Sequence, residues 1–169
     1  MRPRTFLVAL VGSVALALGA VTPLACGSSS SSSAPAADPF VGTWSCSDTS
    51  TTAFTQPANV PLAMDSTTSV VTITDDGKGN LSALREPIDA GPPCTLKSTL
   101  NADDKSTTLI AGQACTTAGG ATLTYTSGGA TLEADGSRTT HSSWMFSGTT
   151  KTGAPLVGTG TGSGSCKKQ

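Results

Sequence analysis

Residues 156–165 have the sequence Leu-Val-Gly-Thr-Gly-Thr-Gly-Ser-Gly-Ser, in which glycine recurs at every second position. A period of two is typical of a β-strand, because successive side chains point to opposite faces of a sheet. One face of this strand carries hydroxyls and the other carries no side chains. We predict that Trp144 or Trp44 covers the bare face, since aromatic rings stabilise strand glycines in this way. A ligand in the groove is the alternative. The glycines concerned are Gly158, Gly160 and Gly162.

Short runs in which threonine or serine alternates with apolar residues recur upstream of this segment, and turn residues separate them. No stretch keeps a helical apolar period over three turns, so the pattern predicts strands throughout. The predicted strands are Thr43–Ser47 (continuing toward Phe54), Ser69–Asp75, Leu81–Arg85, Cys94–Leu100, Thr107–Ala111, Ala121–Thr126, Ala130–Ala134, Arg138–Phe146 and Leu156–Ser165.

These strands are joined mostly by short connections, which predicts an all-β antiparallel meander of about eight or nine strands. A meander must protect its edge strands, and it does so by closing into an up-and-down barrel or by folding over as a β-sandwich. The barrel is the expected form and the sandwich is the alternative. The core contains few large side chains, so disulfides are expected to supplement it.

The chain contains 5 cysteines, and the hairpin register pairs two of them. A turn centred on Asp104-Lys105 places Leu100 opposite Leu109 and Cys94 opposite Cys115. Directly opposed residues have Cβ atoms about 4.5–5.5 Å apart, which is near disulfide distance. The sequence therefore predicts a Cys94–Cys115 disulfide.

A second disulfide, Cys46–Cys166, is predicted between the remaining cysteines of the domain. It would join the first strand to the last, which are neighbours in a closed barrel. Zinc is disfavoured because no Cys-x-x-Cys pair is present and the expected compartment is oxidising.

The first 25 residues have the organisation of an export signal. Arg2 and Arg4 form a basic start, and the apolar run Phe6–Val21 follows. This run is shorter than the about 20 residues that a membrane-spanning helix needs. We predict a signal peptide over 1–25.

The end of this segment, Leu24-Ala25-Cys26 followed by Gly27, resembles the lipobox of bacterial lipoproteins. The resemblance implies cleavage before Cys26 and a lipid on this cysteine. It also implies a Ser/Pro-rich tether over 26–39 that holds the β domain (40–169) at a membrane of the cell envelope. Because Gly27 stands where aspartate retains enteric lipoproteins in the inner membrane, we expect the outer membrane. Ordinary secretion, with cleavage near Ala17 or Ala20, is the alternative.

The charge of the mature chain argues against nucleic-acid partners. Without Arg2 and Arg4, 8 of the 10 basic residues remain beside 11 acidic ones. The resulting net charge is about −3, and no basic stripe occurs.

Residues with catalytic or metal-binding potential are few. His141 is the only histidine, and we expect a solvent-facing strand position for it. Glu86 and Asp89 are expected on a surface loop, and 75–80 is expected to be a hairpin turn and not a calcium site. We therefore expect no enzyme, no cofactor and no metal site.

The start of the first strand, Gly42-Thr43-Trp44, resembles the Gly-x-Trp motif of lipocalins and related small barrels. The resemblance implies an up-and-down barrel that is closed at one end by Trp44 and that holds a small apolar molecule. The chain has neither the family's Thr-Asp-Tyr motif nor an arginine on the predicted last strand.

We therefore expect a cell-envelope lipoprotein that binds a small apolar ligand or a peptide, through contacts that include Trp44 and Trp144. A structural or interaction lipoprotein with a filled core is the alternative. A cavity of several hundred Å³ would favour binding. Its expected lining residues are Val71, Ile73, Leu96, Leu109, Leu123 and Tyr125.

Overall fold

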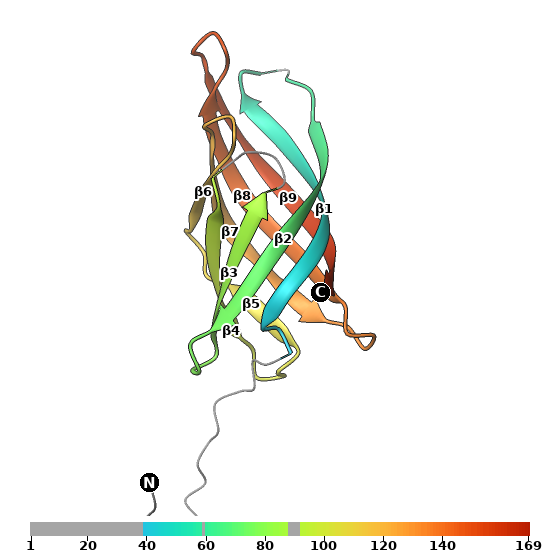
Figure 1. Ribbon diagram of the computed structural model, residues 1–169. Helices are drawn as coiled ribbons and strands as arrows, with labels where there is room; N and C mark the ends of the chain where they lie inside the picture. Colours follow the sequence, from blue (N-terminus) through green and yellow to red (C-terminus); the bar gives the residue numbers. More distant parts are fainter. Residues whose placement is uncertain (1–38, 59, 88–91) are drawn as a thin grey trace, which may run out of the picture. The chain divides into compact units, whose positions relative to one another are not determined.

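The computed structural model describes residues 39–58, 60–87 and 92–169, and these form β-strands without a helix (Figure 1). Cys26, the predicted signal peptide and most of the tether lie outside the described residues. In the described part of the chain, no helix is both long and apolar enough to span a membrane. The strands are β1 (Gly42–Gln56), β2 (Ala63–Asp75), β3 (Asn80–Pro87), β4 (Cys94–Leu100), β5 (Ser106–Leu109), β6 (Ala114–Thr116), β7 (Thr122–Leu132), β8 (Arg138–Thr149) and β9 (Pro155–Lys168).

The strands close into a barrel (Figure 1). The hydrogen-bonded order is β5-β4-β3-β2-β1-β9-β8-β7-β6, and an additional pairing joins β5 to β7. Eight strands therefore form a ring in which every neighbouring pair is antiparallel, while β6 pairs with β7 outside the ring. This confirms the predicted up-and-down barrel over the sandwich.

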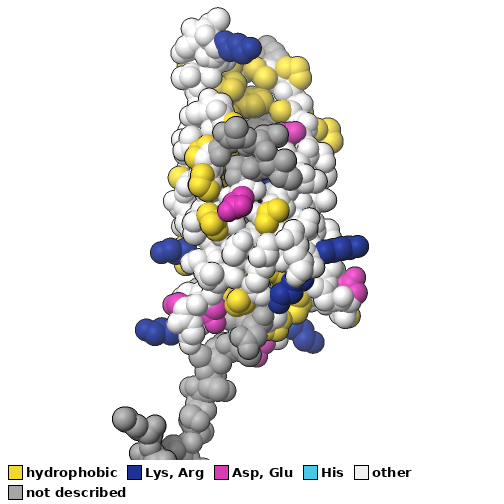
Figure 2. Space-filling view, in the orientation of Figure 1, with side chains coloured by type: hydrophobic (Ala, Val, Ile, Leu, Met, Phe, Trp, Pro, Cys, Tyr) yellow, Lys and Arg dark blue, Asp and Glu magenta, His cyan; other side chains and the backbone are white. Residues whose placement is uncertain are grey.

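Alternation along each strand separates the inside of the barrel from the outside. On β2, Ser69, Val71 and Ile73 are buried, whereas the intervening residues are partly exposed. The outer face is rich in threonine and serine, which suit an exposed pleated surface. In the view of Figure 2, uncharged polar groups cover much of the surface, and most charged side chains lie toward the end where the described chain begins.

Two apolar clusters fill the barrel at different heights. The first lies at the end where β1 begins and includes Phe40, Trp44, Ile73 and Leu81, with the Cys46–Cys166 disulfide. We call this end the closed end. The second lies nearer the opposite end, which we call the open end, and contains Tyr125 and Trp144 with the Cys94–Cys115 disulfide.

Both predicted disulfides are present, but the register argument for one of them was wrong. Cys46 lies directly opposite Cys166 on neighbouring strands, as predicted. On β4 and β5, however, Leu109 faces Ser98 instead of Leu100. The reason is the hairpin loop, where Asn101 pairs with Ser106 and so shifts the register by two residues. Cys115 therefore reaches Cys94 from β6 and not from the strand paired with β4.

The segment from Thr122 to Leu132 is one strand, and not the two predicted strands Ala121–Thr126 and Ala130–Ala134 with a turn between them. A bulge between Tyr125 and Ser127 bends it, and the strand continues through the glycines. A Cβ on Gly129 would overlap the carbonyl group of Thr107 on β5. The glycine thus permits the close backbone approach that closes the ring, which is an established use of glycine in a strand. The short strand β6 was not predicted.

The bare face of β9 is filled as predicted, by Trp144 and not by Trp44. Trp144 lies opposite Gly160, and a Cβ on either Gly160 or Gly162 would meet its indole ring. Gly158 lies against the backbone of Ala53 and Phe54 instead. Further along, a Cβ on Gly164 would overlap the carboxylate of Asp48. The glycine stripe therefore gives inward space to the Trp144 ring and to the half-buried carboxylate of Asp48.

We predict that Gly160→Ala lowers the free energy of unfolding by about 1–3 kcal/mol, because its Cβ would overlap the Trp144 ring and force the core to shift. Chemical denaturation measures this change. The control is Thr161→Ala on the exposed outer face of the same strand, where we expect a change within about 0.5 kcal/mol. Equal effects at the two positions would contradict the packing described here.

Three hairpins at the closed end share one device, an aspartate that accepts hydrogen bonds within its own turn. The Asn80 side chain and the Lys78 N–H hold the pKa of Asp76 below its ordinary value. The Lys105 N–H lowers the pKa of Asp103, and Ser137 lowers that of Asp135. Such Asx-type turns stabilise tight hairpins without buried contacts.

Acid is predicted to loosen these hairpins. Because the folded-state pKa values lie below the ordinary 3.8, the stability they contribute is complete above the ordinary pKa and is lost as the pH falls through the lowered values. The triple variant Asp76→Asn, Asp103→Asn, Asp135→Asn should therefore show a smaller drop in Tm between about pH 5 and pH 2.5 than the native chain. Identical pH profiles would contradict this account.

Candidate functional site

Trp44 plugs the closed end of the barrel. Its indole Nε1 donates a hydrogen bond of 2.8 Å to the carbonyl oxygen of Phe40, and both side chains are 0 % exposed. The Arg138 guanidinium carbon lies 5.1 Å from the centre of the ring, and Lys168 Nζ lies 5.6 Å from it. Trp44 therefore fills the closed end of the barrel, next to the point where the described chain begins.

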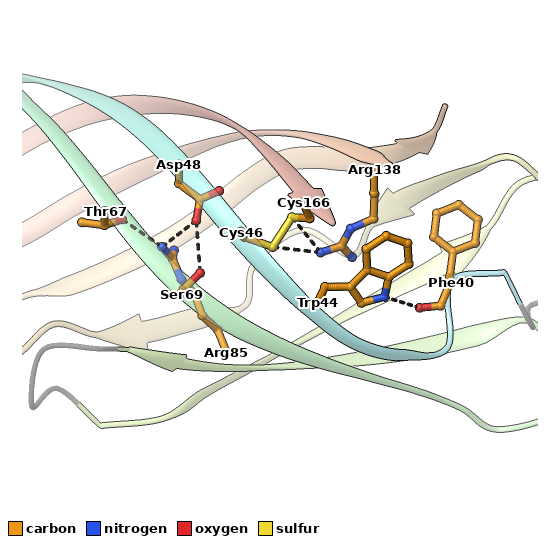
Figure 3. The surroundings of a disulfide bond; sticks show 9 residues. All are labelled: Phe40, Trp44, Cys46, Asp48, Thr67, Ser69, Arg85, Arg138 and Cys166. Atoms are coloured by element: carbon orange, nitrogen blue, oxygen red, sulfur yellow. Dashed lines mark hydrogen bonds and ion pairs between the residues drawn. A yellow bond between two sulfur atoms is a disulfide. The ribbon is translucent and has the colours of Figure 1, made fainter. Parts of the chain in front are cut away.

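Arg138 was not recognised in the sequence as a site residue. It comes from β8, the strand before the last, and its guanidinium lies between the Trp44 ring and the Cys46–Cys166 disulfide (Figure 3). Nη2 approaches Cys166 Sγ at 3.3 Å and Cys46 Sγ at 3.6 Å. Sulfur is a weak acceptor, and the buried Nε has no hydrogen-bond partner among the described residues.

The charge of Arg138 is buried in a poorly polar environment. Burial lowers the pKa of Arg138 to about 10, and the more distant Asp48 opposes this shift. The side chain therefore stays positively charged at neutral pH. Among the described residues, no carboxylate lies within ion-pair distance of it. The Arg138 cation is therefore stabilised mainly by the face of the Trp44 ring. This cation–π contact compensates only part of the free-energy cost of burying the charge.

A second charged group, on the open-end side of the disulfide, is an ion pair (Figure 3). Arg85 Nη2 donates to Asp48 Oδ2 at 2.9 Å and contacts Thr67 Oγ1 at 3.2 Å. Ser69 Oγ donates to the same carboxylate oxygen at 3.3 Å. The side chains of Arg85 and Asp48 are 37 % and 22 % exposed. The interior of the barrel is therefore polar at this level.

Two hollows extend from this ion pair. An inner cavity of about 150 Å³ lies between the two arginines, and its wall includes Val71, Leu109 and Thr107. A second hollow of about 280 Å³ lies on the other side, next to the Cys94–Cys115 disulfide and Leu123. Arg85, Leu96 and Tyr125 line both. The closed end around Trp44 is packed, and the two hollows lie around Arg85 and Tyr125, beside the second apolar cluster.

Tyr125 is the polar aromatic group of this region. Burial raises the pKa of its phenol, and the nearby Arg85 partly opposes the shift. The hydroxyl is thus neutral at physiological pH and acts as a hydrogen-bond donor as well as an acceptor. Together with the ion pair and with serine and threonine side chains on the walls, it places polar groups beside the aliphatic residues of both hollows, as a small-molecule site requires.

The residues predicted from sequence divide into three groups. Trp44 and Trp144 lie inside the barrel, but at different heights, and Ile73 belongs to the packed closed end and lines neither hollow. Glu86 and His141 are exposed, and Asp89 lies outside the described residues. In the part of the chain that the structure describes, no cluster of potential metal ligands occurs.

Asp48, Arg85 and Arg138 were not predicted from the sequence, although their strand positions gave a signal. Asp48 is two residues from the inward Cys46, and Arg85 is two residues from Ala83, so strand alternation places both inside. They were passed over because charged residues are expected at the surface of a barrel in water.

No family model matches the chain, and no curated protein matches it.

The two disulfides are predicted to differ in their effect on stability. Cys46–Cys166 spans 120 residues and Cys94–Cys115 spans 21, so loop-closure entropy gives about 5 and about 3 kcal/mol respectively. Replacing Cys46 and Cys166 by alanine should therefore cost more than the same change at Cys94 and Cys115. Urea denaturation of the two double variants measures the difference, and the reverse order would contradict it.

Proposed function

We propose that this protein is a lipid-anchored binding protein of the bacterial cell envelope. It holds a small molecule in the hollows around Arg85 and Tyr125 and catalyses no reaction. The single observation that carries the proposal is the uneven filling of the interior. The end around Trp44 is packed, whereas about 150 Å³ and about 280 Å³ stay free around Arg85 and Tyr125. A barrel that served only as a spacer would have no need of a polar hollow.

The position of the chain's entry supports this function. The described chain enters at Pro39 and Phe40, next to Trp44 at the closed end. A tether attached through Cys26 would therefore reach the barrel at its packed end. The opposite end, with the β1–β2 and β8–β9 connections, would face away from the membrane. An outer-membrane anchor fits the glycine at position 27.

The ligand proposed here is amphipathic and not purely apolar. Aliphatic residues such as Leu96 and Leu109 line the inner cavity, but Asp48, Arg85 and Tyr125 line it too. A purely apolar molecule would remove water from this ion pair and from the Tyr125 hydroxyl without replacing its hydrogen bonds, which is unfavourable. A molecule with one polar group and a short apolar body satisfies both parts of the wall.

The second candidate, a structural or interaction lipoprotein, is favoured by one observation. The inner cavity of about 150 Å³ is smaller than the roughly 300–1,000 Å³ of sites for drug-sized ligands. Under this alternative, water fills the hollow and solvates the ion pair.

The anchor is tested by changing the cysteine itself. Cys26→Ala should remove lipid labelling and move the protein from the membrane fraction to the soluble fraction of the envelope, because one residue supplies the whole attachment. Metabolic labelling with a fatty-acid analogue and fractionation measure both effects, with Ser28→Ala as the control. Unchanged membrane attachment of the unlabelled variant would contradict the proposal.

Native mass spectrometry of the full-length protein, purified from its own host, tests ligand binding. We expect an added mass from a small molecule that is released on unfolding. The variant Leu96→Trp, which fills the wall shared by both hollows, should lose this mass. A native chain that carries only water would support the structural alternative.

A further inference from the structure

The inner cavity holds more positive than negative charge. Arg85 and Arg138 both line it, whereas Asp48 is the one carboxylate on its described wall. Asp48 is engaged by Arg85 at 2.9 Å. Arg138 is only 5 % exposed, and its Nε has no partner in the described part of the chain. Since a buried charge without a counter-charge is unfavourable, an anion in this cavity would be stabilised.

Hydroxyl groups on the same wall add hydrogen-bond donors. Thr107 Oγ1 accepts a bond of 3.2 Å from the Ala130 N–H, so its own hydrogen is free to be donated. Tyr125 is held neutral by burial, and Thr140 also lines the cavity. Two guanidinium groups and several hydroxyls therefore line this cavity. Its one carboxylate, Asp48, is already paired with Arg85. This inventory suits an oxyanion better than a cation or a neutral molecule.

Much of the remaining wall is aliphatic, beside Ser98, His141 and Ser142, and this aliphatic part narrows the class of anion. Val71, Ala83 and Leu96 line the cavity together with Leu109 and Ala130. A strongly hydrated divalent anion such as sulfate would lose much of its hydration here, whereas a singly charged carboxylate loses less. The shared lining of the two hollows at Leu96 and Tyr125 gives an attached apolar chain a route toward the open end.

We propose that the inner cavity is a carboxylate site, with Arg138 as the residue that binds the anion and Arg85 at its outer side. This deepens the proposed function and rests on it. The carboxylate is either a small free one or the head group of an amphiphile whose chain extends toward the open end. Arg138 then has two roles, closing the barrel on Trp44 and neutralising the ligand.

Isothermal titration calorimetry on the full-length protein, in a neutral detergent at constant chloride, tests the proposal. The probes are acetate, butyrate and octanoate, with butyramide and octanamide as neutral molecules of the same shape. Carboxylates should bind at least tenfold more tightly than the matching amides, because only they complete the charge at Arg138. Emission from Trp44, 5.1 Å from that guanidinium, should change in the same titration.

Two variants should act in opposite directions. Arg138→Met should weaken carboxylate binding by about ten- to hundredfold and remove the preference over amides. Asp48→Asn should strengthen it several-fold, because it removes the competing carboxylate from Arg85. Lys97→Met, which removes an exposed cation on the outer face of β4, is the matched control. Circular dichroism checks that each variant folds. If Arg138→Met does not fold, the comparison of acids with amides on the native chain still tests the proposal.

The outcomes separate the two proposals. Similar affinities for acetate and octanoate support a free small carboxylate, and tighter binding of octanoate supports an amphiphile. Equal binding of acids and amides overturns the carboxylate site and leaves the binding function intact. If the probes do not bind and native mass spectrometry also finds no ligand, both proposals fall.

Discussion

The pairing of β1 with β9 is the constraint on which the rest of the structure depends. An up-and-down barrel has no free edge only if its first and last strands meet, and here they pair from Trp44↔Lys168 to Gln56↔Val157. The Cys46–Cys166 disulfide links directly opposed residues of that ladder. The same closure brings Arg138 of β8 over the Trp44 ring and places Asp48 above the bare position of Gly164. The plug and the polar interior both follow from this one junction.

Alternation in the sequence was sufficient to predict the fold class and most strands, whereas Cys94–Cys115 was predicted from a register that the structure does not have. The alternation pattern did not predict features that depend on the backbone alone, such as strand register and close backbone contacts. The β4–β5 register was wrong by two residues because a shift of two keeps every side chain on its face, so the apolar pattern cannot detect it. The glycines at positions 128 and 129 look like a turn, but they serve the close contact between β5 and β7. This contact between β5 and β7 exists only in the closed ring, so the local sequence around the two glycines does not predict it.

The candidate site was harder to predict for a different reason. Alternation along the strands places Asp48, Arg85 and Arg138 on the inner face of the barrel. Because the chain has few charged residues, the predicted lining of the ligand site consisted of apolar residues instead. The structure places two guanidinium groups and one carboxylate on the described wall of the inner cavity. In a chain with so few aromatic side chains, the buried Arg138 supplies bulk as well as charge, because its guanidinium lies over the Trp44 ring. Its packing role and its chemistry therefore cannot be separated by sequence pattern.

The position of the Cys46–Cys166 bond has a mechanical consequence. Tension applied to the chain ahead of Pro39 would enter the barrel through Phe40 and load β1 in shear against both of its neighbours. The covalent cross-link at Cys46 lies six residues after Phe40 and two after Trp44, and it passes that load to the C-terminal strand. The hydrogen bonds of the remaining ladder, toward Gln56, would then carry almost none of the pull. The hollow part of the barrel would thus keep its shape while the segment that leads into it is stretched.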